Sequence, residues 1–133
     1  MNVSGASTVF QVKELASSLR FYCDVLGFHQ DFEFGSYAGL HFGECHLHLC
    51  AHTVWRRPLG GGAVVVFADE VDAYCAAVKG RGAEVALEPE DQPYGMRDFV
   101  ARDPDGNVLT FACPLPEGAV LPDGEGEEQA AQV

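Results

Sequence analysis

The chain has 133 residues, 47% of them hydrophobic, which is ordinary for a globular protein and enough for one domain or two small fused modules. Twenty acidic residues against eight basic ones give a net charge of −12, and this argues against nucleic acid as a partner, because binding to phosphates depends on cationic side chains. No run approaches the ~18 apolar residues of a membrane helix, and the N-terminus lacks the pattern of a signal peptide, so no membrane partner is expected.

The cysteines indicate a reducing compartment. Their number is odd and no Cys-x-x-Cys spacing occurs, which argues against a disulfide framework or a zinc knuckle. We therefore expect a cytoplasmic protein whose thiols are reduced and act mostly as small apolar side chains.

The first half of the chain predicts a strand, a helix and three more strands. A strand is expected over 7–12, followed by a helix near 16–26 whose apolar residues recur at helical spacing. Ser17 or Ser18 is the expected cap of this helix and Gly27 its stop. The three strands that follow are expected at 29–34, 37–42 and 45–51.

The same order of elements then returns after a glycine-rich loop. A strand is expected over 63–68 and a helix near 70–80, with Asp69 as its cap. Three further strands are expected at 83–89, 97–103 and 107–113. Two βαβββ halves in one short chain predict a duplicated module.

A tight hairpin is expected between the last two strands, at Asp103-Pro104-Asp105-Gly106. Proline presets φ at the second turn position, and glycine accepts the positive φ that follows. The question that this hairpin raises is what its strands present on their other face, where a metal enzyme would place a carboxylate or an imidazole.

Charged side chains elsewhere have a simpler interpretation. Glu33, Glu44 and Asp98 are expected to be solvated. Arg97 and Arg102 are expected to pair with acids such as Asp103 or Asp98. Residues 117–133 hold five acids and no base and are rich in glycine, which predicts a disordered, solubilising tail. Subtracting these five charges leaves −7 on residues 1–116, a field that suits a cationic ligand and equally serves solubility.

Four segments carry a family resemblance: "ELASSLRFYCDVLGF" (14–28), "DFEFGSYAGLHFGECHLHL" (31–49), "EVDAYCAAVKGRGAEV" (70–85) and "QPYGMRDFVARDPDGNVL" (92–109). Together they resemble the glyoxalase/bleomycin-resistance group of the vicinal oxygen chelate superfamily. The resemblance implies an α+β fold in one domain, 1–116, made of two βαβββ modules at about 7–52 and 63–115. In this family the eight strands curl into a cleft that dimerisation commonly completes.

The resemblance also locates the superfamily's divalent metal. Carried over by position, its ligands fall on Ser7, His48, Ala63 and Thr110. Serine, alanine and threonine are poor ligands, and one histidine does not hold an ion that wants three protein ligands. We therefore expect no metal, no other cofactor and no catalytic residue at these positions.

Strand alternation bears on the histidines. His46 and His48 fall on the face opposite two leucines, so His48 lines the cleft if Thr110 does. A solvent-facing position for both histidines is the alternative. Zinc at His46, His48 and His52 is disfavoured, because two alternate strand residues and one loop residue make poor geometry without a carboxylate.

Aromatic residues are the better candidates for ligand contacts. By the resemblance, the drug-contacting aromatics of the antibiotic-sequestering members map onto Phe32, Tyr37, Phe67 and Tyr94, and plain core packing is the alternative for each. Two of these replace tryptophans of the bleomycin binders, which disfavours bleomycin itself and leaves a flat aromatic ligand. Trp55, in the glycine-rich loop, either flanks the groove or pins the loop.

These observations favour a metal-free binding protein of the bleomycin-resistance type. It would sequester a cationic or aromatic, antibiotic-like small molecule in a groove at a homodimer interface. The alternative is a metalloenzyme of the same fold, a lyase, isomerase or dioxygenase, with an atypical ligand set around His48. The expected ligand-binding residues are Phe32, Tyr37, His48, Trp55, Phe67, Tyr94 and Thr110.

Overall fold

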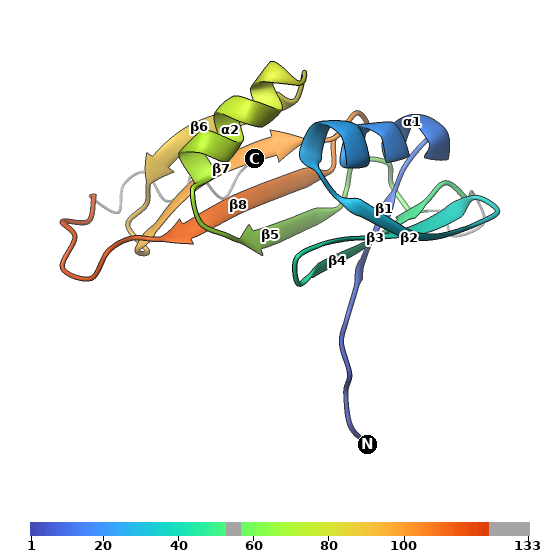
Figure 1. Ribbon diagram of the computed structural model, residues 1–133, viewed down its shortest axis with the longest axis horizontal. Helices are drawn as coiled ribbons and strands as arrows, with labels where there is room; N and C mark the ends of the chain where they lie inside the picture. Colours follow the sequence, from blue (N-terminus) through green and yellow to red (C-terminus); the bar gives the residue numbers. More distant parts are fainter. Residues whose placement is uncertain (53–56, 123–133) are drawn as a thin grey trace. The chain divides into compact units, whose positions relative to one another are not determined.

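The computed structural model describes residues 1–52 and 57–122, so Trp55 and the tail beyond residue 122 lie outside it. The chain forms two compact units, each holding one four-stranded sheet (Figure 1). The N-terminal unit is Met1–Gly62 together with Asp103–Asn107, and the C-terminal unit is Ala63–Arg102 together with the chain from Val108 onward. Within the described part of the chain, no helix is long and apolar enough to cross a membrane.

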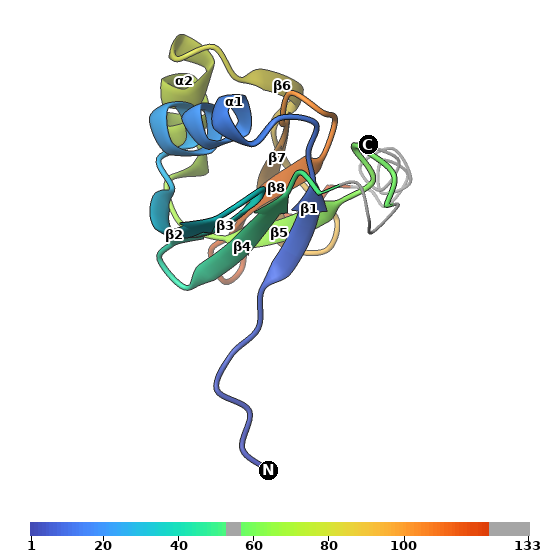
Figure 2. The ribbon, with the colours of Figure 1, turned by 90° about the vertical axis from the view of Figure 1, so that its right-hand side faces the viewer.

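The N-terminal unit has the strand order β1-β4-β3-β2. β1 pairs with β4 in parallel, and the other pairs are antiparallel. An extended, exposed segment, residues 1–7, precedes β1 and runs away from it (Figure 2). The elements are β1 (Thr8–Gln11), α1 (Leu15–Arg20), the π-helical η1 (Phe21–Leu26), β2 (His29–Phe34), β3 (Tyr37–Phe42) and β4 (Cys45–Cys50).

The first helix begins earlier than its serines predict. Glu14 is the N-terminal flanking residue, no side chain caps the helix, and Ser18 is buried inside it, so the predicted serine cap is wrong. Leu15 is buried, and packing this side chain outweighs the capping preference of the serines. The predicted stop is confirmed, because Gly27 ends the helix with a φ of 91°.

The C-terminal unit repeats this topology with the order β5-β8-β7-β6. The parallel pair is again formed by its first and last strands. Its helix contacts three of the strands and lies across one face of the sheet (Figure 1). The elements are β5 (Ala63–Phe67), α2 (Val71–Gly80), β6 (Glu84–Asp91), β7 (Met96–Arg102) and β8 (Val108–Pro114).

Helix α2 packs a regular apolar stripe on its sheet. Val71, Cys75 and Val78 are its buried residues, at the i, i+4, i+7 spacing that places them on one face. The predicted cap at Asp69 is wrong, because Glu70 takes that place with a φ of 48° and makes no side-chain cap. The α+β class and the βαβββ order of both halves are confirmed, and both sheets are open.

The turn between β7 and β8 is part of the N-terminal unit. Asp103 organises it, since its Oδ1 accepts hydrogen bonds from the backbone N–H groups of Asp105 (2.9 Å) and Asn107 (2.8 Å). Gly106 has a φ of 97°, and its N–H donates to the carbonyl of Asp103 at 3.0 Å. The hairpin predicted from the Asp-Pro-Asp-Gly sequence is therefore confirmed.

Two buried polar side chains anchor this turn in the N-terminal unit. The Tyr22 hydroxyl donates to Asp103 Oδ2 at 2.8 Å. Asn107, fully buried, donates through Nδ2 to the carbonyl of Gln11 (3.1 Å), while its Oδ1 accepts from the N–H of Gly62 (2.8 Å). A segment late in the sequence thereby satisfies buried polar groups beside β1.

Candidate functional site

The outer face of the N-terminal sheet, opposite its buried leucines, carries most of the predicted site residues of that unit. In the pairing register, His48 of β4 lies between Val9 of β1 and Gly39 of β3, and Gly39 lies beside Phe32 of β2. Leu47, next to His48, is fully buried. The predicted alternation of β4 is confirmed, and His48 shares a face with Phe32.

Phe32, Tyr37 and His48 meet in one group, which we call the aromatic cluster. The rings of Phe32 and Tyr37 are nearly parallel with centroids 6.3 Å apart, and the His48 ring stands edge-on to Phe32 at 5.4 Å. The Tyr37 hydroxyl lies 2.8 Å from Nδ1 of His48, a hydrogen bond whose direction depends on the histidine tautomer. Three of the predicted ligand residues thus contact one another.

Gly39 makes room for this cluster. A Cβ at this position would lie 2.1 Å from the Phe32 ring, well inside any real contact. The ring therefore rests directly on the backbone of β3, which only a residue without a side chain permits. Phe32 still exposes 44% of its surface, so one ring face is open to solvent.

The phenylalanine and tyrosine rings of the aromatic cluster are uncharged at neutral pH. Burial raises the pKa of Tyr37 above its ordinary value, and Cys50 adds to this shift while Arg57 opposes it. The phenol is therefore protonated and able to hydrogen-bond. The cluster offers ring faces and one phenol–imidazole pair, the chemistry of orientation and stacking.

An open hollow of about 450 Å³ adjoins the cluster at His48. It is lined by the segment Ser4–Ser7 together with His46 and His48. Ser7 and His48 are the residues of this unit to which the resemblance assigns metal ligands, and a hydroxyl with one imidazole does not make the donor set of a catalytic ion. In residues 1–52 and 57–122, no group of three or more His, Cys, Asp or Glu side chains is arranged to hold a metal.

The corresponding face of the C-terminal sheet carries Phe67 and Thr110. Val65, the neighbour of Thr110 in the register, shares this face with Phe67, which is 72% exposed. Thr110 is half-buried and Ala63 is exposed, so the two residues of this unit to which the resemblance assigns metal ligands provide a hydroxyl and a methyl group. Neither arrangement fits the family's divalent metal.

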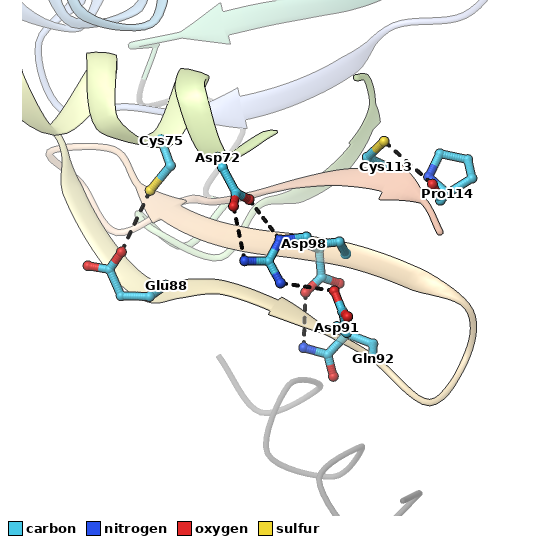
Figure 3. A network of polar contacts seen from close by, with 9 residues as sticks. Asp72, Cys75, Glu88, Asp91, Gln92, Asp98, Cys113 and Pro114 are labelled. Atoms are coloured by element: carbon cyan, nitrogen blue, oxygen red, sulfur yellow. Dashed lines mark hydrogen bonds and ion pairs between the residues drawn. The ribbon is translucent and has the colours of Figure 1, made fainter. Parts of the chain in front are cut away.

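The prediction that Asp98 is a solvated charge is wrong. Asp98 is only 6% exposed and accepts a hydrogen bond of 3.1 Å from Nε2 of the Gln92 amide (Figure 3). The Tyr94 hydroxyl donates to the same carboxylate. The register partner of Asp98 is Ala112, which itself lies beside Phe67. A buried carboxylate therefore lies beside Tyr94 and Ala112, in the row of the sheet that also holds Phe67.

The arginines beside Asp98 do not pair with it. Arg97 instead donates to Asp72 of α2 (2.8 Å) and to Asp91 (2.9 Å), on the helix side of the sheet. Arg102 lies 3.9 Å from Glu84. The sequence signal for Asp98 was an acid placed between Met96 and Val100, the apolar residues two positions away on the same face of β7.

The predicted ligand residues thus fall into two groups, one on each unit. Phe32, Tyr37 and His48 form the aromatic cluster of the N-terminal unit. Phe67, Thr110 and Tyr94 belong to the C-terminal unit, where Tyr94 is tied to Asp98. The seventh, Trp55, lies outside the described residues.

Comparisons with known proteins agree with this architecture. The family model described as Glyoxalase/Bleomycin resistance protein/Dioxygenase superfamily matches residues 6–111. No curated protein matches the sequence. Many solved structures share the fold.

Three of these structures illustrate the range of proteins that share the fold. A glyoxalase/bleomycin resistance protein from Streptomyces sp. CB03234 is 26% identical, with 81% of this chain and 98% of that chain covered and a TM-score of 0.70. A glyoxalase/bleomycin resistance protein/dioxygenase from Nocardioides is 20% identical over 92% and 89%, with a TM-score of 0.71. A lactoylglutathione lyase from Agrobacterium tumefaciens is 22% identical over 84% and 95%, also with a TM-score of 0.71.

Proposed function

Because the chain belongs to the Glyoxalase/Bleomycin resistance protein/Dioxygenase superfamily, we propose that it binds a flat aromatic or cationic small molecule without the superfamily's metal. Binding would lower the free concentration of an antibiotic-like compound, which needs affinity and abundance and no catalytic group. The observation that carries this proposal is the aromatic cluster of Phe32, Tyr37 and His48.

The cluster has the features of a stacking site. The Phe32 ring is fixed against Gly39 on one side and open on the other, and its neighbour Tyr37 is held by His48. Offset-stacked aromatic pairs contribute about 0.5–1.5 kcal/mol beyond the area they bury. A rigid, half-open ring binds a flat ligand with little loss of side-chain entropy.

The C-terminal unit supports a preference for cations. Asp98 places a carboxylate beneath an exposed face that carries Phe67, and Tyr94 hydrogen-bonds to the same carboxylate. A cation over an aromatic ring gains about 0.5–2 kcal/mol. The net charge of the whole chain, −12, adds a long-range attraction of the same sign.

The side chains at the superfamily metal positions support binding over metal catalysis. Ser7, Ala63 and Thr110 carry no imidazole or carboxylate, and Nδ1 of the fourth residue, His48, is engaged with Tyr37. The competing proposal is a metalloenzyme, and the lactoylglutathione lyase from Agrobacterium tumefaciens has this fold at 22% identity. Dependence of activity on an added divalent metal would favour that alternative.

We propose further that the protein works as a homodimer. Phe34 on β2 and Phe67 on β5 are 84% and 72% exposed, and both strands lie at the edges of their sheets. Exposed apolar edges are commonly covered by a second copy. Sedimentation at micromolar concentration should give twice the mass of the 14.3 kDa chain, and a monomer would contradict the dimer.

A thermal-shift screen followed by titration tests the binding proposal. We would screen metal-stripped protein against aromatic cations, neutral flat aromatics and cationic glycopeptides, and titrate each hit by intrinsic fluorescence. Phe32→Leu removes the stacking ring and should weaken binding of a flat hit by about 1–3 kcal/mol, the stacking contribution plus the lost area.

Phe21→Leu is the matched control. It makes the same substitution on η1, away from the sheet face, and should leave the affinity unchanged. Equal affinities of wild type and Phe32→Leu would show that the cluster is only packing.

A further inference from the structure

Three histidines lie side by side on neighbouring strands of the N-terminal sheet. His29 of β2 pairs in register with His41 of β3, and His41 pairs with His46 of β4. The ring centroids are 5.3 Å apart for His29 and His41, and 6.1 Å for His41 and His46. We call this set the histidine row. It crosses the sheet through the pair of His41 and His46, next to the row formed by Gly39 and His48 on the same face.

A β-bulge brings a carboxylate to the central histidine. The register of β2 and β3 shifts between Gln30 and Phe32, so Asp31 is the extra residue of the bulge. Its Oδ1 lies 2.6 Å from Nδ1 of His41. In the neutral imidazole this contact places the proton on Nδ1 and leaves the lone pair of Nε2 available.

A carboxylate on the far nitrogen is the usual partner of a metal-binding histidine. Such a partner fixes the tautomer and the ring orientation and makes the ligating nitrogen more basic. The His41 and Asp31 side chains are 37% and 40% exposed, and His29 is exposed, so an ion in solution can reach all three.

The spacing of the rings suits a shared ion. With metal–nitrogen bonds of about 2.0–2.1 Å, two imidazoles at a tetrahedral angle place their ring centres roughly 5 Å apart. The 5.3 Å separation of His29 and His41 fits this geometry, and the 6.1 Å separation of His41 and His46 is wider. The first pair is therefore the better chelate.

We propose that His29 and His41 bind a divalent transition-metal ion such as Zn²⁺ or Ni²⁺, with Asp31 positioning His41 and water filling the other coordination places. Imidazole nitrogens suit these ions, whereas Mg²⁺ and Ca²⁺ prefer oxygen ligands. Since the described residues preform no set of three or more ligands, this site has two protein ligands and exchanges its ion readily. It is separate from the superfamily position at His48 and independent of the proposed function.

Calorimetric titration of the full chain tests this site. Protein stripped with chelator and kept reduced would be titrated near neutral pH with NiCl₂ and ZnCl₂, and with MgCl₂ for comparison. We expect one Ni²⁺ or Zn²⁺ per chain and no heat of binding from Mg²⁺. His29→Gln and His41→Gln should each weaken Ni²⁺ binding more than tenfold, and Asp31→Asn by roughly 10-fold, at the low end for loss of a hydrogen-bond partner of a metal ligand.

Two variants serve as matched controls. His52→Gln removes a histidine that follows β4, and Cys45→Ser removes a half-buried thiol, and both should bind Ni²⁺ as the wild type does. Thermal midpoints equal to that of the wild type would show that the variants are folded.

A second readout locates the ion. Paramagnetic Ni²⁺ should broaden the ring proton signals of His29 and His41 before those of His48. Unchanged Ni²⁺ affinity in His41→Gln, or broadening centred on His48 or on the cysteines, would overturn the assignment. Loss of binding in His46→Gln with none in His29→Gln would equally overturn the proposed pair.

Discussion

Tyr37 of the N-terminal unit and Asp98 of the C-terminal unit occupy the same place in their sheets. Each lies on the strand next to the last strand of its module, beside Cys50 in one case and Ala112 in the other. Tyr37 joins an imidazole and an open phenylalanine ring, whereas Asp98 is a buried carboxylate held by an amide and a phenol. One topology thus carries two chemistries, stacking on the first unit and negative charge on the second.

His48 and Thr110 show the same divergence. Both pair with a valine of their parallel partner strand, Val9 and Val65 respectively. On the neighbouring strand, His48 lies beside Gly39, whereas Thr110 lies beside Val100. The glycine admits the Phe32 ring, and the buried valine fills that place itself. The repeated topology gives the two units equivalent positions in their sheets, and the residue type at each position decides the chemistry of the face.

Removing the charge of Asp98 in the C-terminal unit should have the largest effect on ligand affinity. Asp98→Asn keeps the shape of the side chain and abolishes its charge. For a cationic hit about 6 Å away, at an effective dielectric constant of about 20, affinity should fall by roughly 2–3 kcal/mol. Calorimetric titration at low and at physiological salt measures it, and the salt dependence should decrease in the variant. An unchanged affinity would show that the charge of Asp98 does not contribute to binding.

The interiors of the units differ as well, and Tyr22→Phe tests that difference. In the C-terminal unit Tyr74 packs its ring on Phe111 at 4.9 Å, whereas Tyr22 donates a hydrogen bond to Asp103. Losing this bond to a buried charged acceptor should lower the free energy of unfolding by about 1.5–3 kcal/mol at neutral pH. Urea denaturation measures the change, and a change below about 0.5 kcal/mol would contradict the assigned role.

The same variant has a pH signature. Burial, and then the neighbouring Asp103, raises the pKa of Tyr22 far above its ordinary value. Because the folded-state pKa is the higher one, this group's contribution is fully present below about pH 10 and is lost as the pH rises further. The difference between wild type and Tyr22→Phe should shrink above that pH, by up to about 1.4 kcal/mol per pH unit. A constant difference would contradict a buried, neutral phenol.

Tyr94→Ala tests whether the second unit contributes a ring as well as a charge. Binding of a flat cation should weaken by roughly 1–3 kcal/mol, the stacking contribution plus the lost area. Fluorescence titration measures it, with rising salt weakening the wild type further by screening. Equal affinities without salt dependence would mean that Tyr94 only packs against the sheet.

The smallest effect on affinity is expected from a substitution that makes the face of the N-terminal sheet resemble that of the C-terminal sheet. Gly39→Val copies Val100 into the N-terminal sheet and forces the Phe32 ring off β3. Stability should change by less than about 1 kcal/mol, because the displaced Phe32 ring has solvent on its open side to move into and valine favours strands. Binding of a neutral flat hit should nevertheless weaken about tenfold, or about 1.4 kcal/mol. Persistence of the Phe32–His48 nuclear Overhauser contact in the variant would refute this account of the cluster.

Local patterns sufficed to predict the elements. Strand alternation predicted the strands to within about two residues, and helical spacing predicted both helices. The residues Asp103–Gly106 predicted the hairpin turn. The predicted capping residues were wrong, because burial of Leu15 and a left-handed Glu70 overrode the preferences of serine and aspartate.

The chemistry of the two faces depended on pairing that no local pattern contains. His29, His41 and His46 become neighbours only through the register of three strands and the bulge at Asp31. Asp98 was predicted to be a solvated charge because its burial depends on hydrogen bonds from Gln92 and Tyr94, two residues that precede β7. The grouping of Phe32 with His48 likewise required the strand pairing around Gly39.

The most direct test of metal-free binding is one titration carried out twice. A flat aromatic hit is titrated into chelator-stripped protein, and then into protein supplied with Zn²⁺, Mn²⁺ or Ni²⁺, with His48→Gln alongside. We predict the same Kd in both conditions and no change in the compound itself. Binding or turnover that appears only with the metal and disappears in His48→Gln would contradict the account.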